Sequence, residues 1–301
     1  MKKQVFIACC IILSLSACQK DFTVQVPGTN LMVVNSQFNT NGPMTLYLTT
    51  SYPANNTNNN VSAITDAQIE LYENNVFKEN LRYVPSNSLN TFGFYTSAMT
   101  PQPGNTYMIK ATEKNYPTVT ATDVVPLAPQ ILSCSLLQYP GTGIGPMAVD
   151  LKFQDRPTDG VQYYRLDVYL TGVKFTVDHY NDTAYQQFAN AISPLVVTTL
   201  SDTLRDIYGF FLFSDRGWSG QQKDILIKNL THALASNVVS ANLLVELHAV
   251  SEAHYKYYQT LSVYNSVSVN TGIQAYVYSD IQNGYGIFCG ETWQENTFKL
   301  R

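Results

Sequence analysis

Residues 107–122 read Tyr-Met-Ile-Lys-Ala-Thr-Glu-Lys-Asn-Tyr-Pro-Thr-Val-Thr-Ala-Thr, and this stretch decides the fold class. Its two ends, 107–111 and 118–122, are short runs rich in apolar and β-branched residues, and Asn115-Tyr116-Pro117 lies between them. β-Branched and aromatic residues favour strands, whereas Asn and Pro favour the turns that join strands. We therefore predict that 107–111 and 118–122 pair as neighbouring strands of one sheet.

Short strands of the same kind are expected on the N-terminal side of this pair. Residues 31–34, 46–48 and 69–72 are apolar or alternating runs, and turn residues such as Gly42-Pro43 separate them. Short strands at even spacing are typical of two packed antiparallel sheets. We predict a mainly β protein whose first domain is an immunoglobulin-like β-sandwich over residues 31–127.

The rest of the chain, residues 128–301, is predicted to form a larger β-rich domain with one short helix. Residues 148–153 and 163–170 flank a stretch rich in Asp, Pro and Gly, so we expect a β-hairpin there. The helix is expected near residues 251–264, with Ser251 as its N-cap.

The N-terminal residues predict a secreted protein. Lys2 and Lys3 precede an apolar segment, residues 5–15, which is too short to span a bilayer as a stable anchor. The next residues, Leu15-Ser16-Ala17-Cys18, resemble the lipobox of bacterial lipoproteins. The alternative is an ordinary secretory peptide that carries a Cys at this position by chance.

The lipobox resemblance implies that Leu15-Ser16-Ala17 is recognised by a signal peptidase and that Cys18 receives the lipid. Residues 1–17 are then a signal peptide, and residues 18–30 are the lipidated Cys and a tether. Several acyl chains on one residue give a stable anchor, because each buried methylene contributes about 0.8 kcal/mol. We expect a lipoprotein.

The residues after Cys18 indicate the destination. Gln19 rather than Asp follows it, which fits sorting to the outer membrane, and Gln19-Lys20-Asp21 resembles a partial export signal of Bacteroidota surface lipoproteins. We therefore expect a lipid-anchored outer-membrane protein on the cell surface. The 18 Lys+Arg against 22 Asp+Glu, with a net charge of −4, argue against a nucleic-acid partner.

Two cysteines, Cys134 and Cys289, remain after the signal peptide and the lipidated residue. In an oxidising envelope they are able to form one disulfide. Their separation in sequence gives no geometric support for that bond. A disulfide and two buried thiols are both open.

Two patterns invite a catalytic or Zn²⁺-binding interpretation, and each lacks a required part. Ser219 lies in Gly-Trp-Ser-Gly, but a nucleophile elbow needs its second Gly one residue later, between a strand and a helix. His248, Glu252 and His254 form the densest His and carboxylate group, but they lack the spacing that places two His on one helical face. We interpret these histidines as surface or structural residues.

A Ca²⁺ site on Asp155 and Asp159 is also not expected, because two acids are few for such a site. The sequence therefore predicts no catalytic residue, no metal ligand and no cofactor. Paired carboxylates for hydrolysis are able to meet from distant strands, which keeps an envelope hydrolase as an alternative.

Aromatic residues are the most suggestive material for binding, since the chain has 21 Tyr and 2 Trp. Such side chains bury a large area at a small entropic cost and are common in binding sites. We select Trp218, Tyr257 and Trp293 as candidate ligand- or partner-binding residues. Tyr257 is chosen because it points away from the helix face of Tyr255 and Tyr258. The alternative is that strands prefer aromatic residues in any case.

Several segments, in order and spacing, resemble the domain-of-unknown-function 4249 family of Bacteroidota envelope lipoproteins. They are Leu31-Met32-Val33-Val34-Asn35, Pro103-Gly104-Asn105-Thr106-Tyr107, Tyr163-Tyr164-Arg165-Leu166, Phe213-Ser214-Asp215-Arg216-Gly217-Trp218-Ser219-Gly220, Leu247-His248-Ala249-Val250-Ser251 and Gly286-Ile287-Phe288. Members are often encoded near TonB-dependent outer-membrane receptors. The resemblance implies an accessory or substrate-handling role and supplies no catalytic residues.

The expected function is that of a non-enzymatic accessory or substrate-binding partner of a TonB-dependent transporter. The expected partners are the outer membrane through the lipid anchor, a TonB-dependent receptor, and a glycan or peptide ligand. A structural or adhesive surface module is the alternative.

Overall fold

The computed structural model describes residues 30–52, 61–87, 92–138, 147–158, 160–177, 183–193, 195–205, 209–228, 230, 237–267 and 276–301. The predicted signal peptide, Cys18 and the tether therefore lie outside the described residues. Within these ranges the protein is mainly β, as predicted, and no described helix is long and apolar enough to cross a membrane.

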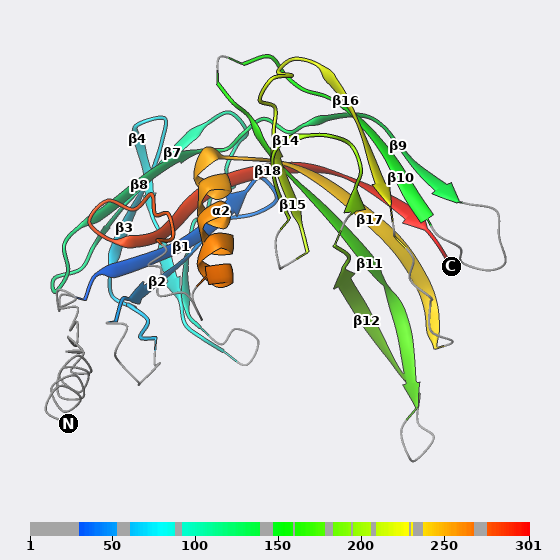
Figure 1. Ribbon diagram of the computed structural model, residues 1–301. Helices are drawn as coiled ribbons and strands as arrows, with labels where there is room; N and C mark the ends of the chain where they lie inside the picture. Colours follow the sequence, from blue (N-terminus) through cyan, green and yellow to red (C-terminus); the bar gives the residue numbers. More distant parts are fainter. Residues whose placement is uncertain are drawn as a thin grey trace, which may run out of the picture.

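One large sheet runs through both halves of the described chain (Figure 1). Its order is β14-β15-β11-β17-β18-β1-β2-β6-β5, and β12 also pairs with β11. The strands are β1 (Met32–Asn39), β2 (Thr45–Thr50), β5 (Arg82–Val84), β6 (Phe94–Thr96), β11 (Tyr163–Val177), β12 (Thr183–Ala191), β14 (Ser201–Arg205), β15 (Phe211–Ser214), β17 (Val238–Val250) and β18 (Tyr285–Lys299).

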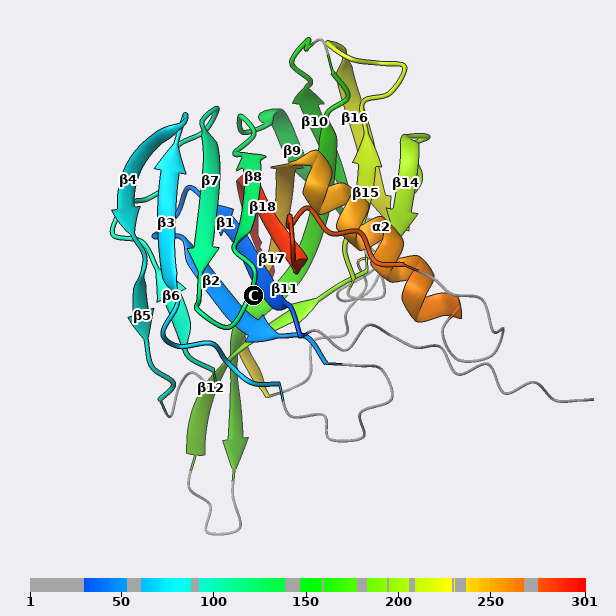
Figure 2. The ribbon, with the colours of Figure 1, turned by 90° about the vertical axis from the view of Figure 1, so that its left-hand side faces the viewer.

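Two smaller sheets cover one face of the large sheet, one on each half. The first has the order β4-β3-β7-β8 and the second the order β13-β16-β10-β9. Figure 2 shows them as separate sets of strands. Their strands are β3 (Gln68–Glu73), β4 (Val76–Asn80), β7 (Thr106–Thr112), β8 (Val119–Val124), β9 (Gln130–Gln138), β10 (Met147–Gln154), β13 (Leu195–Val196) and β16 (Gln222–Lys228).

Each small sheet closes its own hydrophobic core against the large sheet. Buried residues of β1, β2, β3, β7 and β8 form one core, and those of β10, β11, β15, β16 and β17 form the other. The strands alternate buried and exposed positions, because successive side chains point to opposite faces. Two hydrophobic cores thus lie on the same face of the large sheet.

Strand β18 connects these two cores. It pairs in parallel with β1 at its start and antiparallel with β17 along most of its length. Phe288 belongs to the first core, and Phe298 packs against the second. The predicted boundary near residue 128 falls between β8 and β9, but the large sheet continues across it.

Local pairing was predicted correctly in one case and wrongly in another. Strands β7 and β8 pair antiparallel, with Ala111 opposite Val119, which confirms the pairing predicted from residues 107–122. The hairpin predicted from residues 148–153 and 163–170 is wrong. β10 pairs with β9 and β16, whereas β11 pairs with β12, β15 and β17, so the connection crosses from one sheet to the other.

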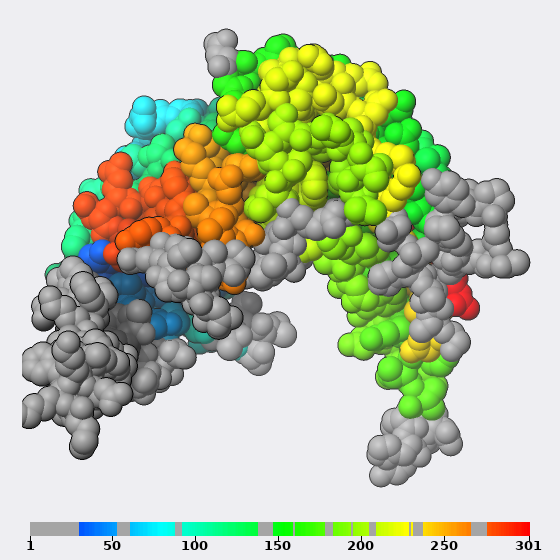
Figure 3. Space-filling model, viewed as in Figure 1, coloured from blue at the N-terminus to red at the C-terminus, as the bar shows by residue number. Residues whose placement is uncertain are grey.

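Helix α2 (Glu252–Val267) covers the opposite face of the large sheet. Its first turn is capped as predicted, because the His254 amide donates to Ser251 Oγ at 3.3 Å. Ala253 packs on Ile287 and Cys289, while Phe288 between them faces the first core. Beyond α2 no described helix or strand covers this face, and we call it the open face; Figure 3 shows the arched outline of the molecule in space-filling view.

Of the two states left open for the cysteines, the structure has the free thiols. Cys134 and Cys289 are both free thiols, the first half-buried and the second buried. Cys134 lies in β9 of the second small sheet, whereas Cys289 faces α2 on the other side of the large sheet.

Candidate functional site

A group of ionisable side chains lies on the open face of the large sheet, beside α2. Arg165 and Asp167 come from β11, Glu246 and His248 from β17, Glu291 from β18 and His254 from α2. We call these six residues the central charge cluster. Between them in sequence, Leu166 and Leu247 point the other way into the second core, as the alternation of a strand requires.

The cluster is held together by short contacts. Arg165 Nε lies 2.7 Å from Asp167 Oδ2, and Arg165 Nη1 lies 3.0 Å from Glu291 Oε2. His248 Nε2 lies 3.0 Å from Asp167 Oδ2 and 3.3 Å from Glu246 Oε2, and its Nδ1 lies 3.4 Å from Glu291 Oε2. Each carboxylate therefore contacts at least one group that carries or accepts a positive charge.

His248 is almost fully buried, with 2% of its surface exposed. Burial alone lowers its pKa, but hydrogen bonds with Asp167, Glu246 and Glu291 outweigh burial and raise the pKa to about 9. His248 is therefore a cation at neutral pH.

The other members respond to the same neighbours. Burial raises the pKa of Glu291 most strongly, but His248 and Arg165 overcome it and hold the pKa at about 2. At Asp167 burial also raises the pKa, but the hydrogen bond with His248 and the charge of Arg165 outweigh it and bring the pKa below its usual value. Burial lowers the pKa of Arg165, yet the charges of Glu291 and Asp167 raise it overall, so the guanidinium stays charged.

His254 behaves in the opposite way, because it is completely buried beside a cation. Burial and the charge of Arg165 lower its pKa to about 3, so its ring is neutral. Arg165 Nη1 lies 3.3 Å from Nε2, which accepts the hydrogen bond and leaves the ring proton on Nδ1. Nδ1 faces Cys289 Sγ at 3.7 Å.

Such a cluster is a candidate functional site. Burying charges has a desolvation cost that their mutual attraction often fails to offset, so stability alone is a weak reason for the arrangement. Strongly shifted pKa values occur preferentially at functional sites. Asp167, Glu246 and His248 also place one ligand atom each within 4.8 Å of one another, close enough to share a metal ion.

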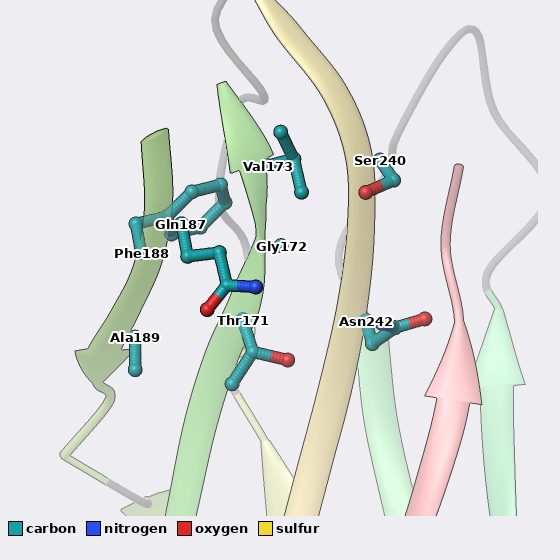
Figure 4. Close-up of a pocket in the computed structure, with 8 residues that line it drawn as sticks. All are labelled: Thr171, Gly172, Val173, Gln187, Phe188, Ala189, Ser240 and Asn242. Atoms are coloured by element: carbon teal, nitrogen blue, oxygen red, sulfur yellow. The ribbon is translucent and has the colours of Figure 1, made fainter. Parts of the chain in front are cut away.

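A pocket lies farther along the same face, with a volume of about 550 Å³. From Asp167 to Thr171 on β11 the distance is about 13 Å, at about 3.3 Å per residue. Figure 4 shows the lining, with the Gln187 amide close to Thr171. None of the described lining residues is charged: Thr171, Gly172, Val173, Gln187, Phe188, Ala189, Ser240 and Asn242.

Gly172 gives this pocket its floor. A Cβ at this position would lie 2.0 Å from the backbone oxygen of Ser240. Only a glycine allows β11 and β17 to approach so closely next to the irregularity in their pairing between Val173 and Lys174.

The family described as domain of unknown function (DUF4249) matches residues 19–297, which is nearly the whole chain. The chain belongs to the DUF4249 family. No curated protein matches it.

In this DUF4249 protein the three aromatic residues selected for binding lie in different environments. Trp218 is 4% exposed in the second core, between Phe153 and Tyr164, so it does not present its ring to a ligand. Tyr257 is half-buried and packs against the small apolar cluster of Ala253, Ile287 and Cys289 between α2 and β18. Trp293 is half-buried on the open face, with its ring centre 5.1 Å from that of His248.

The other sequence candidates of the DUF4249 chain are structural. Ser219 is exposed in the turn after β15. Asp155 is buried and accepts hydrogen bonds from Gln162 Nε2 at 3.0 Å, the Gly220 amide and the Tyr164 hydroxyl. These bonds fix the connection between β10 and β11, where the chain passes from one sheet to the other. Asp159 lies outside the described residues. Glu252 is exposed and contacts Lys256 Nζ at 3.0 Å.

Two further carboxylates carry raised pKa values. Burial is the main cause for both, and it raises the pKa of Asp123 to about 6 and that of Asp280 to about 7. Asp123 Oδ2 accepts from the Gly290 amide at 2.9 Å, and Asp280 Oδ1 from the Phe288 amide at 3.0 Å. Both thus fix the backbone of β18, and neither lines the pocket described above.

Sequence reasoning found His248 and His254 but missed their partners. Of the two interpretations of these histidines, as surface or as structural residues, burial excludes the first, because both lie buried within the cluster. The available signal was the spacing of Arg165 and Asp167, and of Glu246 and His248. Each pair alternates with apolar residues in an otherwise apolar strand, which places both charges of a pair on one sheet face.

Proposed function

We propose that this DUF4249 protein is a lipid-anchored, outer-membrane binding protein that holds a ligand on the open face of its large sheet and serves a TonB-dependent transporter. The lipid on Cys18 and the transporter partner are inferred from the lipobox and from the resemblance described above. No catalytic step is part of this proposal.

The observation that carries the proposal is the pocket of about 550 Å³ on an otherwise open sheet face. Its size is within the range of small-molecule binding sites. The amides of Gln187 and Asn242 and the hydroxyls of Thr171 and Ser240 offer both donors and acceptors. Neutral groups of this kind suit a neutral, hydroxyl-rich ligand such as a glycan better than a charged peptide.

The binding half of the proposal is tested with a panel of neutral oligosaccharides and uncharged peptides on the full-length protein in detergent. We expect a glycan to bind and the double variant Gln187→Ala, Asn242→Ala to weaken its affinity at least tenfold. Gln259→Ala, an exposed amide on α2, is the matched control and should leave the affinity unchanged. Equal loss in the control, or no binding across the panel, contradicts the pocket as a ligand site.

The transporter half is tested by purification of the tagged protein from its native envelope in mild detergent, followed by mass spectrometry. A stoichiometric TonB-dependent receptor supports the accessory role, with a contact area of about 800 Å² or more per partner expected for a stable complex. Recovery of the protein alone contradicts stable docking and favours the structural or adhesive alternative.

A further inference from the structure

The central charge cluster contains three side chains arranged as metal ligands. Asp167 and Glu246 are directly opposite each other on β11 and β17, and His248 is two residues farther along β17 on the same face. His248 Nε2 lies 3.0 Å from Asp167 Oδ2 and 3.3 Å from Glu246 Oε2. Ligand atoms bound tetrahedrally to Zn²⁺ at 2.0–2.2 Å lie about 3.3–3.5 Å apart. The two distances from His248 Nε2 are close to that value, and all three ligand atoms lie within 4.8 Å of one another.

The second ring nitrogen of His248 also faces a carboxylate. His248 Nδ1 faces Glu291 Oε2 at 3.4 Å, while Nε2 faces the two candidate ligands. Metal-bound histidines almost always direct their second nitrogen to a carboxylate, a carbonyl or water, which fixes the ring and its tautomer. Arg165 Nε donates to the same Asp167 oxygen, Oδ2, at 2.7 Å, and a carboxylate oxygen has a second lone pair for an ion. The cluster thus has both the ligands and the residues that orient them.

The balance of charge also permits an ion. A histidine that binds a metal is neutral. The carboxylates of Asp167, Glu246 and Glu291 and the guanidinium of Arg165 then sum to a charge of −2, which a divalent ion neutralises.

We propose that Asp167, Glu246 and His248 form a binding site for a divalent transition metal, with Zn²⁺ as the preferred ion. Imidazole and carboxylate ligands together suit Zn²⁺. Three protein ligands leave a fourth position open, and the most exposed of the three side chains, Glu246 with 16% of its surface accessible, lies on the open face of the sheet. The ion would therefore reach the site from the open face, on the side of Glu246. This proposal does not depend on the pocket or on the transporter.

The experiment uses the full-length protein in detergent, freed of metal with a chelator that is then removed. Zn²⁺ is titrated calorimetrically, and Co²⁺ is titrated by visible absorption as a probe of coordination. We expect one equivalent of each ion to bind and Co²⁺ to show the intense bands of a four- or five-coordinate site. His248→Gln should abolish both signals, and Glu291→Gln should weaken affinity about 10–100-fold through the orientation of the ring.

Glu295→Gln is the matched control, because Glu295 lies opposite Glu246 on the neighbouring strand and the change removes the same charge. It should leave stoichiometry and affinity unchanged. If His248→Gln does not fold, Glu246→Gln replaces it, since this side chain is the most exposed of the three. Absence of binding overturns the proposal, as does binding with unchanged affinity in His248→Gln or Glu246→Gln, because the ion is then bound somewhere other than at these three side chains.

Discussion

Phe288 and Cys289 are neighbours in β18, yet their side chains lie in different compartments. The Phe288 ring packs on Phe38 in the first core, with ring centres 4.5 Å apart, whereas Cys289 Sγ lies 3.7 Å from His254 Nδ1 beneath α2. The relationship follows from the alternation of side chains along a strand. It makes β18 the element that joins the first core to the central charge cluster.

The two thiols are expected to differ in reactivity. Burial raises the pKa of Cys134 to about 12 and that of Cys289 well above its usual value, so neither forms a reactive thiolate readily. Cys134 is half-buried and should be alkylated slowly in the folded protein, while Cys289 should be protected. Mass spectrometry after timed iodoacetamide labelling measures both rates. Faster labelling of Cys289, or a disulfide in the non-reduced protein, contradicts the burial described here.

Gly172→Ala is expected to destabilise the fold by about 1–3 kcal/mol, because the added methyl meets the Ser240 backbone oxygen at 2.0 Å. Urea unfolding measures the free energy of both proteins. Gly42→Ala is the control, since nothing lies within 4 Å of a Cβ built there. Similar losses in both variants would show that the cost arises from the loss of glycine and not from the strand contact.

The two tryptophans should respond differently to a quencher. Trp218 is buried in the second core, and Trp293 is half-buried on the open face. We expect acrylamide to quench Trp293 and to leave most Trp218 emission intact. Trp293→Phe and Trp218→Phe separate the two signals in fluorescence titrations. Strong quenching in Trp293→Phe would mean that the second core is open to solvent.

Stability should depend on pH through Asp280. Burial raises its pKa from 3.8 to about 7 in the folded state, so the folded protein binds this proton more tightly than the unfolded chain does. The stabilising effect is complete below about pH 4 and is lost as the pH rises through 7. Asp280→Asn retains an acceptor for the Phe288 amide and should gain about 1–2 kcal/mol at pH 8, after allowance for partial exposure.

Urea unfolding of Asp280→Asn and the unchanged protein at pH 4 and pH 8 tests this expectation. The two proteins should be closest in stability at pH 4. The variant should keep part of the pH dependence of its unfolding free energy, because the raised pKa of Asp123 is unchanged in it. A variant that is less stable at pH 8 would show that the ionised carboxylate supports β18.

Cys18→Ser is expected to abolish lipidation and move the protein from the membrane fraction to the soluble fraction. Labelling of cells with a palmitate analogue, followed by fractionation, checks both outcomes. Because the substitution leaves residues 30–301 unchanged, their thermal unfolding should be the same in both proteins. Membrane association that persists in Cys18→Ser would contradict the lipid anchor.

Sequence reasoning succeeded where the decisive contacts are local. The pairing of residues 107–111 with 118–122 and the cap of α2 by Ser251 each depend on a few neighbouring residues. It failed where partners are distant. The residues of β11 carry no local mark that distinguishes a partner such as β17 from β10, and the parallel pairing of β18 with β1 joins opposite ends of the described chain.

The candidate site was only partly visible for the same reason. His248 and His254 are near each other in sequence and attracted notice, but Arg165 and Glu291 reach them from other strands. Trp293 was selected for its chemistry alone and lies beside the cluster, whereas Trp218, selected on the same grounds, is a core residue. Residue type alone therefore does not distinguish a tryptophan in the core from one beside the cluster.

Strand β18 is also the last strand in chain order, which has a kinetic consequence. During synthesis every other strand of the large sheet emerges before it, so β1 and β17 stay without their shared neighbour until β18 is made. Contacts that span so much of the chain form slowly, and unpaired strand edges attract other chains. The protein is therefore vulnerable to aggregation until its final segment arrives, and we expect a holding chaperone to be needed most during that interval.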